Sequence, residues 1–418
     1  MKQLTNKIFK DTFIVMISNI INYAGMFILA VMITRFMGVD ALGEFTYIFA
    51  VSTILSVTSE LGLSQLLVRK INAERTLAFS LVRNVNIFKM FVSVLCVLLA
   101  SIVFYLFPGL NFNLTLLIGI TVVIPKTIMA TYDSSIRALQ KQAIPSVIKS
   151  INTFLQIIFT YFILVNTGSL LNIFIMILIM ETLAMFSFNF MNRILWNRSG
   201  NIFSALIPYS FSFIKPVITE SLPFFGSNFL ALSIPRIIVI ILGYLTNAAS
   251  LGIFSAASRF ANGVGLFSGA LYNTFYPAMT NPENSVETRY ALARKFTLYA
   301  FIAGLVISLA IYFLAEMLID LTFRIPEAVP VLKLLGFVVI PVLTHTILQS
   351  FLFSQKYEKS ISYFYIFLWI FNLITCLILV KLYGYWGAAI SAFTFEYIVM
   401  ITLFILLIRH KKYGSKIS

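Results

Sequence analysis

The sequence predicts an all-α, polytopic membrane protein with about twelve transmembrane helices, and three observations support this fold class. Of the 418 residues, 60% are hydrophobic and only 11% are charged, and the mean hydropathy is +0.96. A soluble protein carries roughly 25% charged residues. Apolar runs of about 20 residues, long enough to cross the hydrocarbon core of a bilayer, recur along the whole chain. Lysine and arginine gather in the short segments between these runs.

The apolar runs form two sets of six, separated by a polar stretch. The first run follows Lys2, Lys7 and Lys10 and is longer than the core of a signal peptide, so we interpret it as the first membrane helix. We predict an N-terminal six-helix bundle over residues 1–192, a cytoplasmic linker over 193–217 and a C-terminal six-helix bundle over 218–418. The predicted spans lie near residues 12–34, 43–68, 85–107, 114–136, 144–165, 170–191, 220–242, 252–279, 296–319, 329–354, 361–380 and 387–408.

The loop charges predict the orientation of the chain. With the N-terminus in the cytoplasm, only Arg35, Arg324, Lys333 and Lys381 fall in the outer loops, whereas the cytoplasmic side holds most of the other cations, Lys89 among them. By the positive-inside rule both termini are therefore cytoplasmic. The net charge of +15 reflects this topology, and we expect no nucleic-acid partner.

A short repeat suggests that the two halves are duplicated. Ala41-Leu42-Gly43-Glu44-Phe45 opens the second predicted helix, and Ser250-Leu251-Gly252-Ile253-Phe254 opens the eighth. The shift is 251 − 42 = 209 residues, half of the chain of 418. Such a duplication relates the two halves by an axis along the membrane normal and leaves a natural cavity between them.

Several stretches spread over nearly the whole chain resemble the Wzx O-antigen flippases of the multidrug/oligosaccharidyl-lipid/polysaccharide transporter superfamily. Besides the two repeated stretches, they are Arg35-Phe36-Met37-Gly38, Glu60-Leu61-Gly62-Leu63, Ser255-Ala256-Ala257-Ser258-Arg259, Tyr276-Pro277 and Gly387-Ala388-Ala389-Ile390 with Glu396. The related lipid II flippases usually have two additional helices, so a count of twelve favours the O-antigen type.

The resemblance implies a fold like that of the MATE transporters and a function in lipopolysaccharide O-antigen biosynthesis. A protein of this kind moves an undecaprenyl-pyrophosphate-linked oligosaccharide from the cytoplasmic to the periplasmic leaflet of the bacterial inner membrane by alternating access. The oligosaccharide and the lipid bilayer are then its partners. An O-antigen polymerase and a chain-length regulator are candidate partners as well.

Four cations are candidates for binding the pyrophosphate or an acidic sugar. Lys126, Arg236 and Arg259 lie within the fourth, seventh and eighth predicted spans, and Arg35 closes the first. A charge at such depth is energetically costly unless it is paired with an opposite charge or hydrated. A diphosphate that crosses hydrocarbon needs cations along its path. Arg259 also matches a recurrent arginine of the family that the chain resembles. In the alternative interpretation, Arg35, Lys126 and Arg236 lie near enough to the outer interface to extend their side chains into it.

Acidic side chains within the predicted spans are candidates for ion coupling. Glu60, Glu181 and Glu396 could exchange a proton during transport, or could pair with one of the embedded cations. Asp133 and Glu220 lie near the inner surface, where we expect solvation by the loops.

A few other polar or helix-breaking residues fall within the apolar runs. Pro125, Pro223, Pro235 and Pro341 can each kink a helix that lines a cavity. His345 has no other histidine or cysteine near it in the sequence, so we expect it to form an interhelical hydrogen bond.

Motifs of familiar enzymes and cofactor sites do not occur. The chain has no Gly-x-x-x-x-Gly-Lys, His-Glu-x-x-His or Gly-x-Ser-x-Gly pattern, and its two cysteines have no metal-ligand spacing. We therefore expect no catalytic residue, no cofactor and no metal site. Two alternatives to a flippase stay open. An O-antigen polymerase should carry a long outer loop, which is missing here, and a multidrug exporter of the same superfamily should favour acidic pockets over embedded arginines.

Overall fold

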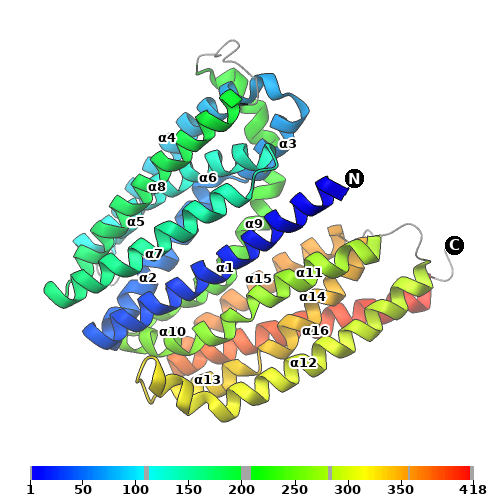
Figure 1. The fold of residues 1–418 in the computed structure, drawn as a ribbon. Helices are drawn as coiled ribbons and strands as arrows, with labels where there is room; N and C mark the ends of the chain where they lie inside the picture. Colours follow the sequence, from blue (N-terminus) through cyan, green and yellow to red (C-terminus); the bar gives the residue numbers. More distant parts are fainter. Residues whose placement is uncertain (1, 108–112, 199–208, 281–284, 356–357, 415–418) are drawn as a thin grey trace. The chain divides into compact units, whose positions relative to one another are not determined.

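The computed structural model describes residues 2–107, 113–198, 209–280, 285–355 and 358–414, and its regular structure in these ranges is entirely helical (Figure 1). This confirms the predicted all-α fold class. The helices are α1 (Lys2–Met37), α2 (Val39–Glu60), α3 (Leu63–Ala73), the 3-10 helix η1 (Arg75–Leu77), α4 (Ala78–Leu106), α5 (Leu114–Thr121), α6 (Val123–Ala138), α7 (Ala143–Asn166), α8 (Leu170–Arg198), α9 (Phe211–Leu245), α10 (Ala248–Gly263), α11 (Gly265–Thr280), α12 (Val286–Leu321), α13 (Ala328–Gly336), α14 (Val339–Ser354), α15 (Glu358–Tyr383) and α16 (Tyr385–Gly414).

The number of membrane-spanning segments agrees closely with the prediction. Among the described residues, 11 helical segments are long and apolar enough to cross a membrane. The difference falls on the predicted span over 252–279, which consists of α10 and α11, two helices of 16 residues that are separated at Val264. Each is too short to span a membrane alone, and together they cover the predicted range.

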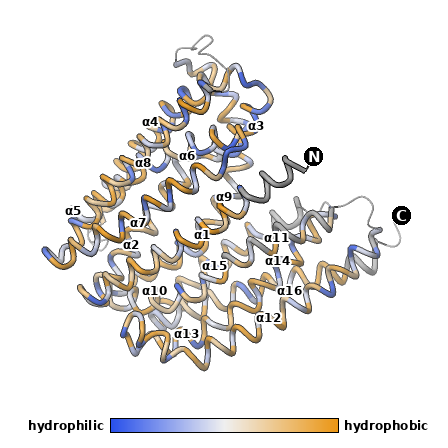
Figure 2. The backbone as a smooth tube through the Cα atoms, viewed as in Figure 1, coloured by the Kyte–Doolittle hydropathy of each residue, from blue (hydrophilic) through white to orange (hydrophobic). Residues whose placement is uncertain are grey.

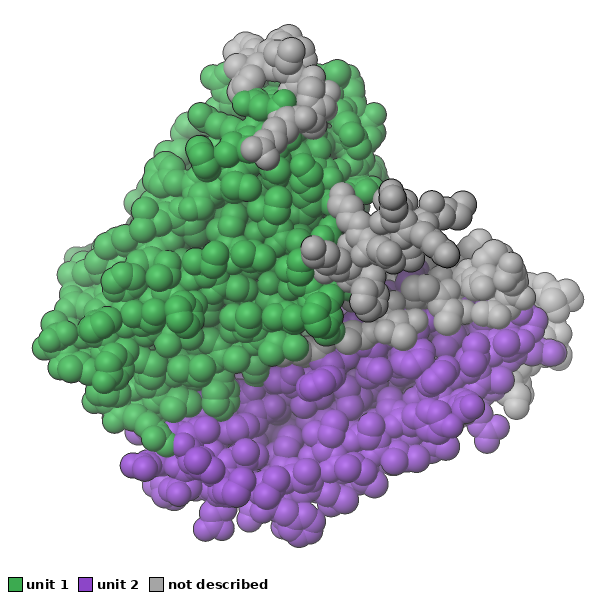
Figure 3. All heavy atoms as spheres, viewed as in Figure 1, with its two compact units in different colours: residues 1–37, 47–236 green, residues 38–46, 237–418 purple. Residues whose placement is uncertain are grey.

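The chain forms two compact units (Figure 3). Unit 1 comprises Met1–Met37 and Tyr47–Arg236, and unit 2 comprises Gly38–Thr46 and Ile237–Ser418. Helices α2 and α9 therefore contribute residues to both units. Residues 199–208 of the predicted linker lie outside the described residues, so the predicted bundle boundaries stay a prediction.

The helices expose apolar side chains and bury polar ones, which is the pattern of a protein dissolved in lipid. Helix α4 exposes one apolar face that includes Leu95, Leu98 and Leu99, whereas Asn84 and Lys89 on the same helix are buried. Figure 2 shows that hydrophobic residues run along most of the helices. An apolar surface this continuous would aggregate in water, and hydrocarbon is the solvent that fits it.

Two corresponding helices are interrupted within the membrane by the same four residues. The sequence Val-Val-Ile-Pro occurs at 122–125, where α5 meets α6, and again at 338–341, where α13 meets α14. A hydroxyl donates to a carbonyl close before each break: Ser52 Oγ to Gly119 O at 2.9 Å and Ser308 Oγ to Gly336 O at 2.8 Å. Proline frees the carbonyl four residues before it, and at the second break this carbonyl, that of Phe337, accepts a hydrogen bond from the Tyr397 hydroxyl at 3.1 Å. Side-chain hydroxyls thus supply donors where hydrocarbon cannot.

A third interruption separates α2 from α3. Leu61 and Gly62 there both have positive φ, 48° and 70°. A methyl group on Gly62 would collide with the backbone of α9 at Ser221 and Phe225, so only glycine permits this close approach of the two chain segments. The break leaves α3 as a separate amphipathic helix, whose buried face packs in one core of unit 1.

The repeated Leu-Gly sequences meet each other in unit 2. A methyl group built on Gly43 would overlap the backbone carbonyl of Ala248, and one built on Gly252 would overlap that of Val39. The two contacts are equivalent under the repeat, because Gly252 corresponds to Gly43 and Ala248 corresponds to Val39, each 209 residues later. Helices α2 and α10 thus cross by a local two-fold relation at the spot where the sequence repeat lies.

Candidate functional site

Two of the four predicted cations meet on one aromatic ring in unit 1. Lys126 on α6 places its Nζ 5.1 Å from the ring centroid of Phe49 on α2. Arg236 on α9 places its guanidinium carbon 5.7 Å from the same centroid. Residues from three helices therefore form a cationic cluster of Lys126, Arg236 and Phe49. Nothing in the sequence singled out Phe49, because it is one of 42 phenylalanines.

The cationic cluster lies deep in the membrane-spanning segments. Lys126 follows Leu114, the first residue of its span, by 12 residues, and Arg236 precedes Leu245, the last residue of its span, by 9. At 1.5 Å per residue, these separations are about 18 Å and about 14 Å. Both residues thus lie near the middle of their candidate spans, which are long enough to cross a hydrocarbon core roughly 30 Å thick.

The ring does not by itself account for two charges at this depth. Within the described part of unit 1, no carboxylate forms an ion pair with Lys126 or Arg236. A cation–π contact contributes about 0.5–2 kcal/mol, whereas a lysine or arginine at the centre of a membrane helix costs about 2.5–3.5 kcal/mol. The contacts with the ring alone therefore do not offset this cost, and water or an anion beside the cluster would.

The helix interruption explains how Lys126 comes to this place. Lys126 directly follows Pro125, which closes the first Val-Val-Ile-Pro sequence. Pairs of interrupted helices at corresponding positions in two repeats are the usual place of transporter binding sites, because the interrupted backbone lines a cavity. In unit 2, His345 follows the corresponding Pro341 by one helical turn.

A buried lysine that the prediction placed on the cytoplasmic side is part of a second cluster in unit 1. Lys89 is fully buried, donates from Nζ to Ser64 Oγ at 3.2 Å and interacts electrostatically with Glu60. The cytoplasmic side predicted for Lys89 stays a prediction; its burial shows in addition that it is not a solvated loop charge, because the positive-inside rule counts charges and does not sense burial. The signal available was its place inside the predicted span 85–107, with Phe88 and Met90 on either side.

The two acidic residues expected to be solvated both form ion pairs. Asp133 is buried, accepts two hydrogen bonds from Arg137 at 2.9 Å and one from Lys149 at 2.6 Å. For this residue the expected loop solvation was wrong, since Lys149 comes from the next helix. Glu220 is exposed, and the ammonium of Lys70, which donates to its Oε1 at 2.8 Å, holds the pKa of this carboxyl below its usual value.

Arg35 and Glu181 are the remaining predicted residues of unit 1. Arg35 ends α1 and is exposed. Glu181 on α8 is buried, and its Oε1 accepts a hydrogen bond from Gln156 Nε2 on α7 at 3.1 Å. Gln156 is a neutral partner, so Glu181 is a carboxylate without a cation in the described part of this unit.

In unit 2, Glu396 belongs to an acid–base cluster of three helices. His345 Nε2 on α14 lies 3.0 Å from Glu396 Oε2 on α16, which confirms the predicted interhelical hydrogen bond of His345. Tyr365 on α15 interacts electrostatically with Glu396. Nδ1 of His345 is buried and has no hydrogen-bond partner in the described structure. Arg259 lies on α10, partly buried, 11 residues after Ala248 where this helix begins.

Solved structures with the same fold are membrane transporters, and three comparisons cover almost the whole chain. The lipid II flippase MurJ in an inward closed conformation matches with a TM-score of 0.71 and 17% identity over 96% of this chain and 87% of that chain. An inward-facing multidrug resistance MATE family transporter of the MOP superfamily matches with a TM-score of 0.68 and 15% identity over 97% and 96%. A variant of the Vibrio cholerae MATE transporter VcmN matches with a TM-score of 0.59 and 17% identity over 99% and 98%.

The fold therefore defines the class: a multi-pass membrane protein built like the MurJ and MATE transporters. The family described as "Polysaccharide biosynthesis protein" matches residues 8–282, and the chain belongs to this family. A search of curated proteins finds no match. Among the described residues, no three histidine, cysteine or acidic side chains form a group that could hold a metal ion.

Proposed function

We propose that this protein is a flippase that moves an undecaprenyl-pyrophosphate-linked O-antigen repeat unit from the cytoplasmic to the periplasmic leaflet of the bacterial inner membrane. The polysaccharide biosynthesis family and the fold shared with a lipid II flippase support a lipid-linked sugar as substrate. The observation that carries the proposal is the cationic cluster of Lys126, Arg236 and Phe49. A polymerase that joins the translocated units and a chain-length regulator are the partners that such a function implies.

The chemistry of the substrate fits the cationic cluster. A pyrophosphate ester carries its charge on oxygens that accept charge-assisted hydrogen bonds, and the fork of an arginine matches two of them. Two cations without a carboxylate partner are free to make these bonds during passage. Arg259 and Arg35 are proposed as further contacts for the pyrophosphate or for an acidic sugar. The two predicted six-helix bundles would open alternately to the two sides of the membrane.

Coupling to an ion gradient is proposed for the acidic residues. Glu396 is the first candidate, because its carboxyl lies 3.0 Å from Nε2 of His345, a second side chain that can exchange protons. Glu181, bonded to a neutral amide, and Glu60, near the Lys89 ammonium, are the other two candidates. No residue is proposed to catalyse a covalent step.

A multidrug exporter is the second candidate function. Two observations favour it. The MATE structures have the same fold, and Glu181 of this chain is a buried carboxylate, which attracts an organic cation. The two functions make opposite demands on the charges of unit 1. A flippase for pyrophosphate lipids needs Lys126 and Arg236, and an exporter of cations needs Glu181.

The test measures lipid translocation by the full-length protein in proteoliposomes. The substrate is a fluorescent undecaprenyl-pyrophosphate-linked oligosaccharide, and a membrane-impermeant quencher reports the leaflet that it occupies. Since a hydrogen bond to a charged group contributes about 1.5–3 kcal/mol, Lys126→Gln and Arg236→Gln should each slow translocation by about tenfold or more. Lys381→Gln, which removes an exposed cation at the end of α15, should not slow it.

Two results would contradict the proposal. One is translocation by both cluster variants at the rate of the unmodified protein. The other is transport of an organic cation such as ethidium that is abolished by Glu181→Gln and unaffected by Lys126→Gln, which would establish the exporter instead.

A further inference from the structure

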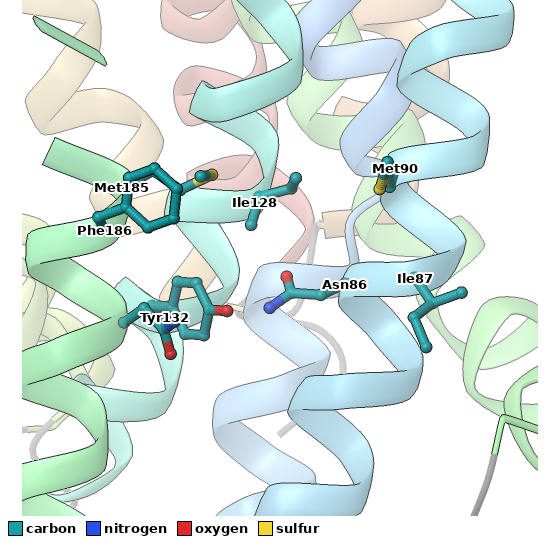
Figure 4. A pocket seen from close by; sticks show the side chains of 8 residues that line it. Asn86, Ile87, Met90, Ile128, Tyr132, Met185 and Phe186 are labelled. Atoms are coloured by element: carbon teal, nitrogen blue, oxygen red, sulfur yellow. The ribbon is translucent and has the colours of Figure 1, made fainter. Parts of the chain in front are cut away.

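A pocket in unit 1 opens between three helices (Figure 4). Its volume is about 250 Å³, and its walls come from α4, α6 and α8. Met90 on α4 and Phe186 on α8 line it and are more than half exposed, so the pocket opens toward the hydrocarbon around the protein. A pocket that encloses a whole drug-sized ligand measures roughly 300–1,000 Å³. This one therefore fits part of a larger molecule whose remainder lies in the bilayer.

Each of the three helices contributes an apolar and a polar side chain to the pocket, in the same order along the membrane normal. At one level lie the apolar residues Met90 and Phe186, and the polar residues Asn86 and Tyr132 lie at the next level (Figure 4). Polar and apolar residues follow one another by four positions on all three helices: Asn86 and Met90, Ile128 and Tyr132, Met185 and Asn189. Four residues are one helical turn, so each helix changes from apolar to polar at the same depth.

One turn beyond the polar level, both outer walls carry an arginine. Arg83 precedes Asn86 by three residues on α4, and Arg193 follows Asn189 by four on α8, so each lies on the face that lines the pocket. Both side chains are exposed. Arg193 is close enough to Tyr132 to interact electrostatically with its hydroxyl. The nearby Asp133 would not repel an anion, because Arg137 and Lys149 already pair with it.

This order matches the parts of a phospholipid, and we infer that the pocket binds an anionic glycerophospholipid of the surrounding leaflet. An acyl chain would occupy the level of Met90 and Phe186. The ester oxygens accept hydrogen bonds, and the side-chain NH2 groups of Asn86 and Asn189 and the hydroxyl of Tyr132 are the donors at the polar level. The phosphate would lie between Arg83 and Arg193, as basic pockets at the cytoplasmic ends of membrane helices bind anionic head groups. None of the residues that line the pocket belongs to the cationic cluster, and the inference does not depend on the proposed function.

The test measures lipid binding by native mass spectrometry of the purified full-length protein. Dioleoyl phosphatidylglycerol should bind at least about tenfold more tightly than dioleoyl phosphatidylcholine, since two cations reach its charged head group. The double variant Arg83→Gln/Arg193→Gln should lose this preference, and Asn189→Trp should lose it by filling the pocket. The matched control Arg75→Gln/Lys141→Gln removes the same charge at the same end of unit 1 and should keep the preference. Thermal unfolding of each variant without added lipid checks that it is folded.

Three outcomes would overturn the inference. The two lipids could bind the unmodified protein equally well, in which case no anionic head group is recognised. The control could lose as much preference as the pocket variants, in which case the effect is a general attraction to a basic surface. Undecaprenyl phosphate could bind in place of phosphatidylglycerol, in which case the pocket receives the transported lipid.

Discussion

At the residue scale, two lysines in apolar helices of the same unit have opposite surroundings. Lys89 is fully buried and has Glu60 and Ser64 as partners, whereas Lys126 has only the ring of Phe49. A charge with a partner contributes to the fold. A charge without a partner lowers the stability of the folded state, and such charges in membrane helices are commonly functional.

We expect Lys89→Met to destabilise the protein by about 1–3 kcal/mol, because it removes the hydrogen bond to Ser64 Oγ and the electrostatic interaction with the half-buried Glu60. Thermal unfolding of the purified protein measures the loss. The double variant Glu60→Gln/Lys89→Met should recover part of it, because no charge is left without a partner.

Lys126→Met is the matched comparison for Lys89→Met. It removes the same charge from an apolar helix and leaves no carboxylate alone, so we expect unchanged or higher thermal stability together with slow translocation. A large loss of stability in Lys126→Met would show that Lys126 belongs to the fold as Lys89 does.

At the element scale, the close crossing of α2 and α10 depends on two glycines. Since a methyl group on either would overlap a backbone carbonyl, we expect Gly43→Ala and Gly252→Ala to lower the free energy of unfolding by about 1–3 kcal/mol each, as overpacking does. Gly226→Ala is the control: Gly226 lies in α9 with nothing within 4 Å of an added methyl group. Alanine there should stabilise the helix by up to about 1 kcal/mol. Equal effects of all three substitutions on thermal unfolding would contradict the crossing.

The sequence predicted the helices well because hydropathy is a local property of each segment. It did not predict the interruptions at Leu61 and Val264, because the backbone geometry at these positions depends on helices packed from elsewhere in the chain. The repeated Val-Val-Ile-Pro was readable in the sequence and was missed, although it marks both interrupted helices of the two halves.

The site was predictable only in part. Depth along a span identified Lys126 and Arg236, but their meeting at Phe49 depends on packing between helices that are far apart in the sequence. Similarly, His345 lacked a partner in the sequence because Glu396 lies 51 residues away.

At the scale of the whole molecule, the predicted topology can be tested by labelling. The chain has only two cysteines, Cys96 and Cys376, so a cysteine-free background needs two substitutions. In that background, Asn166→Cys at the end of α7 should react with a membrane-impermeant maleimide from the periplasm. Gln142→Cys at the other end of α7 should react only after the membrane is opened. The reverse pattern would invert the orientation and with it the predicted cytoplasmic termini.

The crossing at Gly43 and Gly252 has a consequence for the sequence of this chain. When residue i touches residue j and the repeat of i touches the repeat of j in return, the contact is isologous, the kind made by two identical subunits around a two-fold axis. In a homodimer, a single glycine codon would serve both sides of such a contact. In this chain the two copies predicted from the repeat lie in one polypeptide, so a glycine is needed at each of the two positions for the same crossing.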